Sequence, residues 1–139
     1  MDGPQERGSP DRESAEPAVG AAASGSQPSE EEVRDEISRE IHQIYEESYG
    51  KGAGRCETLL VDGWVIVILD ALELLPNEEF LIENGKRDDV AHVRTQYQHA
   101  IQAPLRAAVE RASGRNVIGF ASTTSLEEPR FAVEIFKLH

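Results

Sequence analysis

The stretch from Arg55 to Asp70, RCETLLVDGWVIVILD, decides the fold of this chain. Its Asp62-Gly63 dipeptide suits a two-residue type I′ turn, because both central positions need a positive φ that Asp and Gly tolerate. The turn predicts a β-hairpin with a fixed register: Val61 opposite Trp64, Leu59 opposite Ile66, and Glu57 opposite Ile68. No catalytic motif lies in or near this hairpin.

Each face of the predicted hairpin is apolar, because successive side chains of a strand point to opposite sides. One face carries Leu59, Val61, Trp64, Ile66 and Ile68, and the other carries Leu60, Val65, Val67 and Leu69. The second strand is apolar on both faces, a pattern that is typical of strands covered by other elements on both sides.

Composition limits the classes of partner. The 139 residues carry a formal net charge of -12, whereas nucleic acids and anionic membrane surfaces select basic proteins, so we expect no nucleic-acid partner. The single cysteine, Cys56, excludes an internal disulfide. No apolar run reaches the length of a membrane span and no signal peptide is recognised, so we expect no direct membrane insertion and a cytoplasmic location.

The chain divides into a tail and one domain. Residues 1–28 are rich in Gly, Pro, Ser and acidic residues and lack hydrophobic periodicity, which predicts a disordered tail that can be deleted without loss of the fold. Residues 29–139 are long enough for a single modest core.

Three helices are predicted from periodicity and end signals. Ser29 and Glu32 form a capping box for a first helix that ends near Tyr49. A short helix is expected at Asn77–Glu83. A long helix, capped by Asp88 or Asp89, is expected to run to about Ser113 with a kink or a break near Ala100 to Pro104. The inward stripe of the first helix is Val33, Ile37, Ile41, Ile44 and Ser48, and that of the long helix is Val90, Val93, Tyr97, Ile101, Leu105, Ala108 and Ala112.

Two further strands, Asn116–Thr124 and Arg130–Leu138, complete the predicted order of helix, strand, strand, short helix, long helix, strand, strand. Two hairpins separated by helices indicate an α+β fold: a four-stranded antiparallel sheet with the helices packed mainly on one face.

The loop from Gly50 to Arg55, GKGAGR, is the main candidate for ligand chemistry. It follows a helix and enters a strand, the reverse of a phosphate-binding P-loop, and no Ser or Thr follows Lys51. A small-anion site remains open, formed by Lys51, Gly52 and Arg55 with help from Arg94. The alternative for Arg94 is structural, with its stem buried and its guanidinium on a carboxylate. We expect no catalytic residue, no cofactor and no metal site, since Asp88 and His92 have no second supporting pair.

Short motifs in one consistent order resemble the MpsC-like family of small bacterial proteins, long described as a domain of unknown function. The matching segments are Ile44-Tyr45, Tyr49-Gly50-Lys51-Gly52 and Arg55, then Leu74-Leu75-Pro76-Asn77-Glu78, Arg94, Ser113-Gly114-Arg115-Asn116-Val117 and Phe136-Lys137-Leu138. The chain departs from the family pattern at Ala53, where proline is usual, and at Leu75 and Ser113, where threonine is usual.

The resemblance implies a link to a membrane-potential-generating system and to uptake of ions or dissolved inorganic carbon, in which a small protein accompanies membrane subunits. It implies a non-enzymatic accessory or interaction protein with a membrane transporter subunit as partner. The alternative is a small-anion-binding sensor or enzyme that uses the Gly50–Arg55 loop.

The hairpin also predicts self-association. The chain has one long amphipathic helix and one with a narrow stripe, too little to cover two apolar sheet faces. An uncovered face with large residues such as Trp64 or Leu60 marks an interface, so we expect a two-fold homodimer. The alternative is a monomer in which the first helix covers the second face.

Overall fold

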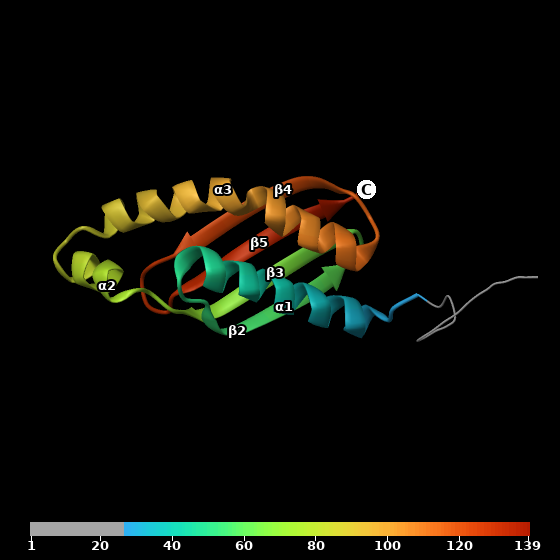
Figure 1. Ribbon diagram of the computed structural model, residues 1–139, viewed down its shortest axis with the longest axis horizontal. Coiled ribbons are helices and arrows are strands. Elements are labelled where there is room, and N and C mark those ends of the chain that lie inside the picture. Colours follow the sequence, from blue (N-terminus) through green and yellow to red (C-terminus); the bar gives the residue numbers. More distant parts are fainter. Residues whose placement is uncertain (1–26) are drawn as a thin grey trace, which may run out of the picture.

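The computed structural model describes residues 27–139, so the predicted tail lies outside the described residues apart from Gln27 and Pro28. Seven elements follow in the predicted order (Figure 1). They are α1 (Glu30–Tyr49), β2 (Ala53–Val61), β3 (Trp64–Leu72), α2 (Pro76–Glu83), α3 (Arg87–Ser113), β4 (Val117–Ser125) and β5 (Phe131–Leu138).

The β2–β3 hairpin has the predicted register. Val61 pairs with Trp64, Leu59 with Ile66 and Glu57 with Ile68. Asp62 and Gly63 both adopt positive φ, 43° and 88°, as a type I′ turn requires. The Asp62-Gly63 turn therefore sets the register of the first hairpin, and with it the face of the sheet on which each side chain lies.

One antiparallel sheet contains all four strands in the order β2-β3-β5-β4, so the two hairpins join through β3 and β5. β5 suits the centre because its residues are mostly apolar on both faces, whereas β4, with four consecutive Ser and Thr residues from Ser122 to Ser125, lies at an edge. The predicted α+β class and the packing of helices on one face are confirmed.

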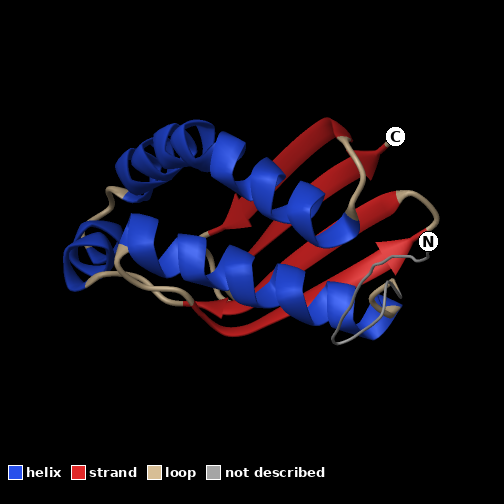
Figure 2. Cartoon of the chain, turned by 45° about the vertical axis from the view of Figure 1, so that its right-hand side comes forward, coloured by secondary structure: helices blue, strands red, loops and turns tan. Residues whose placement is uncertain are grey.

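The core lies between the sheet and a single helical layer (Figure 2). Both α1 and α3 cross the same face, and α1 begins with the predicted Ser29–Glu32 capping box and ends at Gly50 in the left-handed region. The fully buried core residues from the two helices and β3 include Ile37, Ile41, Leu105, Val109, Val65, Val67 and Leu69. The alternative placement of α1 over the second sheet face is therefore not observed.

The predicted start and inner stripe of α3 need correction. The helix begins at Arg87 after Lys86, which makes no side-chain cap, so neither Asp88 nor Asp89 is the N-cap. The helix is continuous through Pro104, which excludes a break there and leaves the kink as the alternative. Val93 and Tyr97 are 51% and 42% exposed, so they do not belong to the inner stripe.

Arg94 and Gln98 take the buried positions of α3 in their place, and Tyr45 and Tyr49 replace the predicted Ser48 at the end of the α1 stripe. Four polar side chains thus enter the core where the two helices face the sheet. Among the described residues, no helix is both long enough and apolar enough to cross a membrane.

Candidate functional site

A chain of hydrogen bonds crosses the core from β4 to β5 through both helices. The Ser122 hydroxyl donates to Oε1 of Gln98 over 2.9 Å. The Gln98 amide donates to the hydroxyl oxygens of Tyr45 and Tyr49, each at 2.8 Å. The Tyr45 hydroxyl in turn donates to Oε2 of Glu134, so the chain ends on a carboxylate.

Glu134 is fully buried, although carboxylates are seldom buried without a cationic partner. Its other carboxylate oxygen, Oε1, has no hydrogen-bond partner among the described residues. Burial raises the pKa of Glu134 to about 7, and hydrogen bonds to the carboxylate from its neighbours offset only part of that effect. Glu134 is therefore a buried acid that changes protonation near neutral pH.

The other ionisable groups close to Glu134 stay neutral in that range. Burial raises the pKa of the Cys56 thiol to about 12, and the negative charge of Glu134 adds to the effect. Burial also raises the pKa of Tyr49 to about 12, and burial together with Glu134 raises the pKa of Tyr45.

Arg94 anchors the outer end of this network to α2. Its Nε and Nη2 donate to the two carboxylate oxygens of Glu78 at 2.8 and 3.0 Å, and its guanidinium lies 4.3 Å from the centre of the Tyr49 ring. Partial burial acts to raise the pKa of Glu78, but the bonds from Arg94 and from the Leu75 N–H outweigh it and lower that pKa. The predicted pairing of Arg94 with a carboxylate is confirmed.

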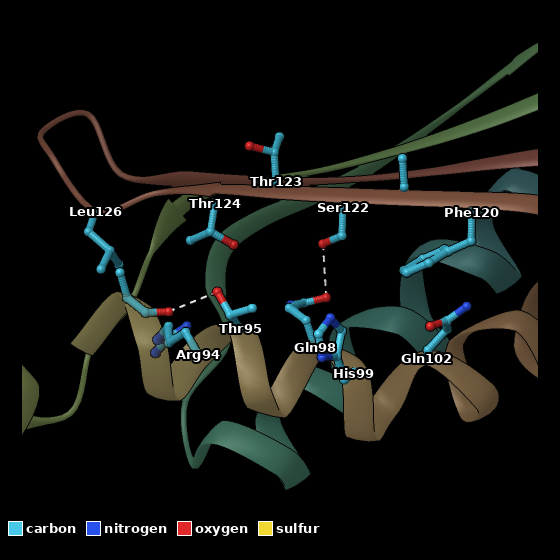
Figure 3. A pocket seen from close by; sticks show the side chains of 12 residues that line it. Arg94, Thr95, Gln98, His99, Gln102, Phe120, Ser122, Thr123, Thr124 and Leu126 are labelled. Atoms are coloured by element: carbon cyan, nitrogen blue, oxygen red, sulfur yellow. Dashed lines mark hydrogen bonds between the residues drawn. The ribbon is translucent and has the colours of Figure 1, made fainter. Parts of the chain in front are cut away.

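A pocket of about 460 Å³ lies between α3 and β4, directly beside the network (Figure 3). Gln98 from α3 and Ser122 from β4 meet across it through their hydrogen bond, and most other lining side chains are polar. The principal ones are Arg94, Thr95, Gln98, His99, Gln102, Phe120, Ser122 and Thr124.

The loop residues predicted to bind an anion occupy different surroundings. Lys51 is exposed, whereas Gly52 packs against α1 so closely that an added Cβ would lie 2.5 Å from Nε2 of His42. Arg94, in its pair with Glu78, lines the α3–β4 pocket. Arg55 lines a separate groove, described next.

That groove, of about 650 Å³, lies between α1 and the edge strand β2. Arg55 lines it together with Arg34 and Arg39 from α1. Arg34 is 3.8 Å from Glu30 and Arg55 is 3.2 Å from Glu57, both exposed ion pairs of small energetic weight. The structure thus gathers three arginines that the sequence pattern did not group.

Apart from Arg94, the sequence analysis missed the polar residues of the buried network, because their neighbours had stronger apolar signals. A signal was nevertheless present: Val90, Arg94, Gln98, Ile101 and Leu105 recur at helical spacing, and Glu134 alternates with Ala132 and Phe136 along β5. No cluster of three metal-ligating His, Cys, Asp or Glu residues occurs within residues 27–139.

Comparison with known proteins gives a family match. Residues 29–139 match a family model described as the Na+-translocating membrane potential-generating system (MpsC). No curated protein and no solved structure matches the chain.

Proposed function

Because this chain belongs to the MpsC family, we propose that it is a non-enzymatic accessory protein of a Na+-translocating membrane system, with a role linked to uptake of ions or bicarbonate through a membrane partner. We further propose that it works as a homodimer in the cytoplasm. The main support for the proposal is the face of the sheet that the helices within residues 27–139 leave uncovered (Figure 1).

The strand register determines which residues are neighbours on this open face. Reading across β2, β3, β5 and β4, its rows are Arg55, Asp70, Phe131 and Ser125; Glu57, Ile68, Val133 and Thr123; Leu59, Ile66, Ile135 and Ala121; Val61, Trp64, Lys137 and Gly119. Leu59, Trp64 and Val61 are 39%, 43% and 51% exposed. A contiguous apolar surface of this kind marks an interface.

The open face fits a second copy of itself. Sheets that pack face to face keep their strands within about 30° of each other. A two-fold axis parallel to the strands, between β3 and β5, places β2 of one copy over β4 of the other. Leu59 of one copy then lies over Ala121 of the other, and Val61 over Gly119. Because the axis is two-fold, each of these contacts between a large and a small residue occurs twice in the interface.

Charge also favours a second copy at this surface. The open face carries Arg55 and Lys137 against Glu57 and Asp70, so it is formally neutral although the chain has a net charge of -12. All four lie outside the central apolar row, and Lys137 lies 4.7 Å from the centre of the Trp64 ring. Two copies can therefore approach through this face without like-charge repulsion between the patches.

The functional test is genetic. Deleting the gene in its source organism should reduce the Na+-dependent membrane potential reported by a potential-sensitive dye, and the wild-type gene should restore it. Trp64→Glu, which places a charge in the open face, should fail to restore the potential, whereas Val93→Glu on exposed α3 should succeed. An unchanged potential in the deletion strain would refute the accessory role.

The arginine groove favours a second candidate, a small-anion sensor. Arg34, Arg39 and Arg55 line one concave surface, and guanidinium groups bind oxyanions in bidentate geometry. Titration with bicarbonate and phosphate should then shift the backbone amide resonances near Gly50–Arg55 in a saturable way. If the anion binds in the groove, Arg39→Ala and Arg55→Ala should lose those shifts and Lys51→Ala should keep them. If it binds at the Gly50–Arg55 loop, Lys51→Ala should lose them as well.

A further inference from the structure

The hydroxyl hydrogen of Ser122 has two acceptors within reach. It is donated to Oε1 of Gln98 over 2.9 Å. Ser122 also lies directly opposite Glu134 on the helix-covered face of the β4–β5 pair, and side chains in that relation have Cβ atoms about 5 Å apart. Burial raises the pKa of Glu134, and hydrogen bonding from Tyr45, Ser122 and Gln98 acts in the opposite direction. Ser122 is therefore close enough to bind the carboxylate as well as the amide.

One oxygen of that carboxylate is open to a donor. Oε2 of Glu134 accepts from Tyr45, whereas Oε1 accepts no hydrogen bond among residues 27–139. Both amide hydrogens of Gln98 are already donated, to Tyr45 and Tyr49. Within the network, the Ser122 hydroxyl is thus the donor that can turn to Oε1 of Glu134. A serine hydroxyl rotates to suit its acceptor, so the turn requires no movement of the backbone.

The protonation state of Glu134 decides which acceptor the Ser122 hydrogen prefers. In the protonated state, Oε1 of Glu134 donates its own hydrogen to Oγ of Ser122, and Ser122 donates to Gln98, so each hydrogen has an acceptor. In the ionised state, Oε1 carries negative charge, and hydrogen bonds to charged groups are stronger than those to neutral amides. The Ser122 hydrogen then prefers the carboxylate, and Oε1 of Gln98 loses its donor.

We propose that Glu134 and Ser122 form a proton-operated switch beside the α3–β4 pocket: loss of the Glu134 proton turns the Ser122 hydroxyl to the carboxylate and breaks the Gln98–Ser122 hydrogen bond between α3 and β4. Gln98 and Ser122 both line this pocket of about 460 Å³ (Figure 3). The ionised state therefore leaves Oε1 of Gln98 as a free acceptor at the pocket wall. The switch is independent of the open sheet face and of the proposed accessory role.

Burial gives Glu134 a pKa of about 7, so the switch operates near neutral pH. Its cross-strand partner on β3, Val67, does not titrate. The titratable and charged side chains around it, taken by element, are Tyr45 and Tyr49 of α1, Cys56 of β2, Glu78 of α2, and Arg94 and His99 of α3.

Most of these groups keep their charge state in the range of the switch. Raised pKa values keep the two tyrosines and Cys56 neutral, and the bonds from Arg94 outweigh partial burial and lower the pKa of Glu78. His99 lies exposed at the pocket, so the experiment includes a variant that removes it.

The test is an NMR pH titration of the full chain that follows the side-chain carbonyl carbons of Glu134 and Gln98. In the wild type, both resonances should change with the same midpoint. Ser122→Ala removes the shared hydroxyl and should raise the pKa of Glu134 by about one unit, because the ionised form loses the stronger hydrogen bond. The Gln98 carbonyl should no longer follow the titration in this variant, and Ser122→Thr, which keeps a hydroxyl, should restore both effects.

Two control variants separate the switch from other causes. His99→Gln and Thr123→Ala, whose side chain lies on the open face, should both titrate as the wild type does. A Gln98 carbonyl that still follows Glu134 in Ser122→Ala would reflect the charge of Glu134 alone and would overturn the proposal. An unchanged pKa of Glu134 in Ser122→Ala, or different midpoints for Glu134 and Gln98 in the wild type, would overturn it as well.

Discussion

Replacing Glu134 with glutamine should stabilise the protein relative to the wild type by an amount that grows with pH. The carboxyl has a pKa of about 7 in the folded protein because of burial, against 4.5 for an ordinary glutamate. As the pH rises, the unfolded chain loses this proton first. The stability that the protonated form contributes is therefore complete below pH 4.5 and is lost as the pH approaches 7.

The magnitude follows from the separation of the two pKa values. It corresponds to about 3 kcal/mol of unfolding free energy, since each pKa unit is worth about 1.4 kcal/mol. The facing groups do not titrate in this window: Tyr45, Tyr49 and Cys56 have raised pKa values, and Glu78 has a lowered one beside Arg94. Glu134 is thus the network group that changes charge there.

Urea unfolding followed by circular dichroism between pH 4 and 8.5, at fixed ionic strength, measures this effect. The difference in unfolding free energy between Glu134→Gln and the wild type should rise by about 3 kcal/mol up to pH 7 and then stay level. Any pH-independent cost of the new amide cancels in this comparison. For the exposed control Glu83→Gln, the difference in unfolding free energy from the wild type should not change with pH. If the difference for Glu134→Gln does not change with pH, the pKa of Glu134 is not raised in the folded protein.

Three further variants test local packing by urea unfolding. Gly63→Val should cost more than about 1 kcal/mol, because valine is strained at the φ of 88°, and a wild-type midpoint would argue against the turn. Gly52→Ala should destabilise the chain because its Cβ would lie 2.5 Å from Nε2 of His42; the companion His42→Ala should relieve part of that loss. Arg94→Met should cost about 3 kcal/mol by leaving Glu78 partly buried without its cation, whereas a cost below about 1 kcal/mol would mean that Glu78 is well solvated.

The sequence predicts the hairpin well because its signals are local. The Asp62-Gly63 turn fixes the register, and the capping box fixes the start of α1, so both are confirmed. The packing of the helices on one face was also predicted and is confirmed, but the order of the strands depends on contacts between segments distant in the sequence. The order β2-β3-β5-β4 was therefore not predicted, although the polar residues of β4 favour a position at the edge of the sheet.

The buried polar network escaped prediction for a different reason. Hydrophobic periodicity assigns apolar residues to the inner face, so Val93 and Tyr97 were chosen over Arg94 and Gln98. Each buried polar residue is stable only because partners from other elements satisfy it, as Tyr45 from α1 does for Glu134. Sequence spacing does not reveal such partners, and it likewise left Glu134 unnoticed.

Sedimentation equilibrium at micromolar concentration tests whether the open sheet face binds a second copy of the chain. The wild type should sediment at twice the 15.3 kDa chain mass. Trp64→Glu should shift the equilibrium to the monomer, and Val93→Glu should remain dimeric. A wild-type chain that sediments at 15.3 kDa at every concentration would show that the open face does not bind a second copy.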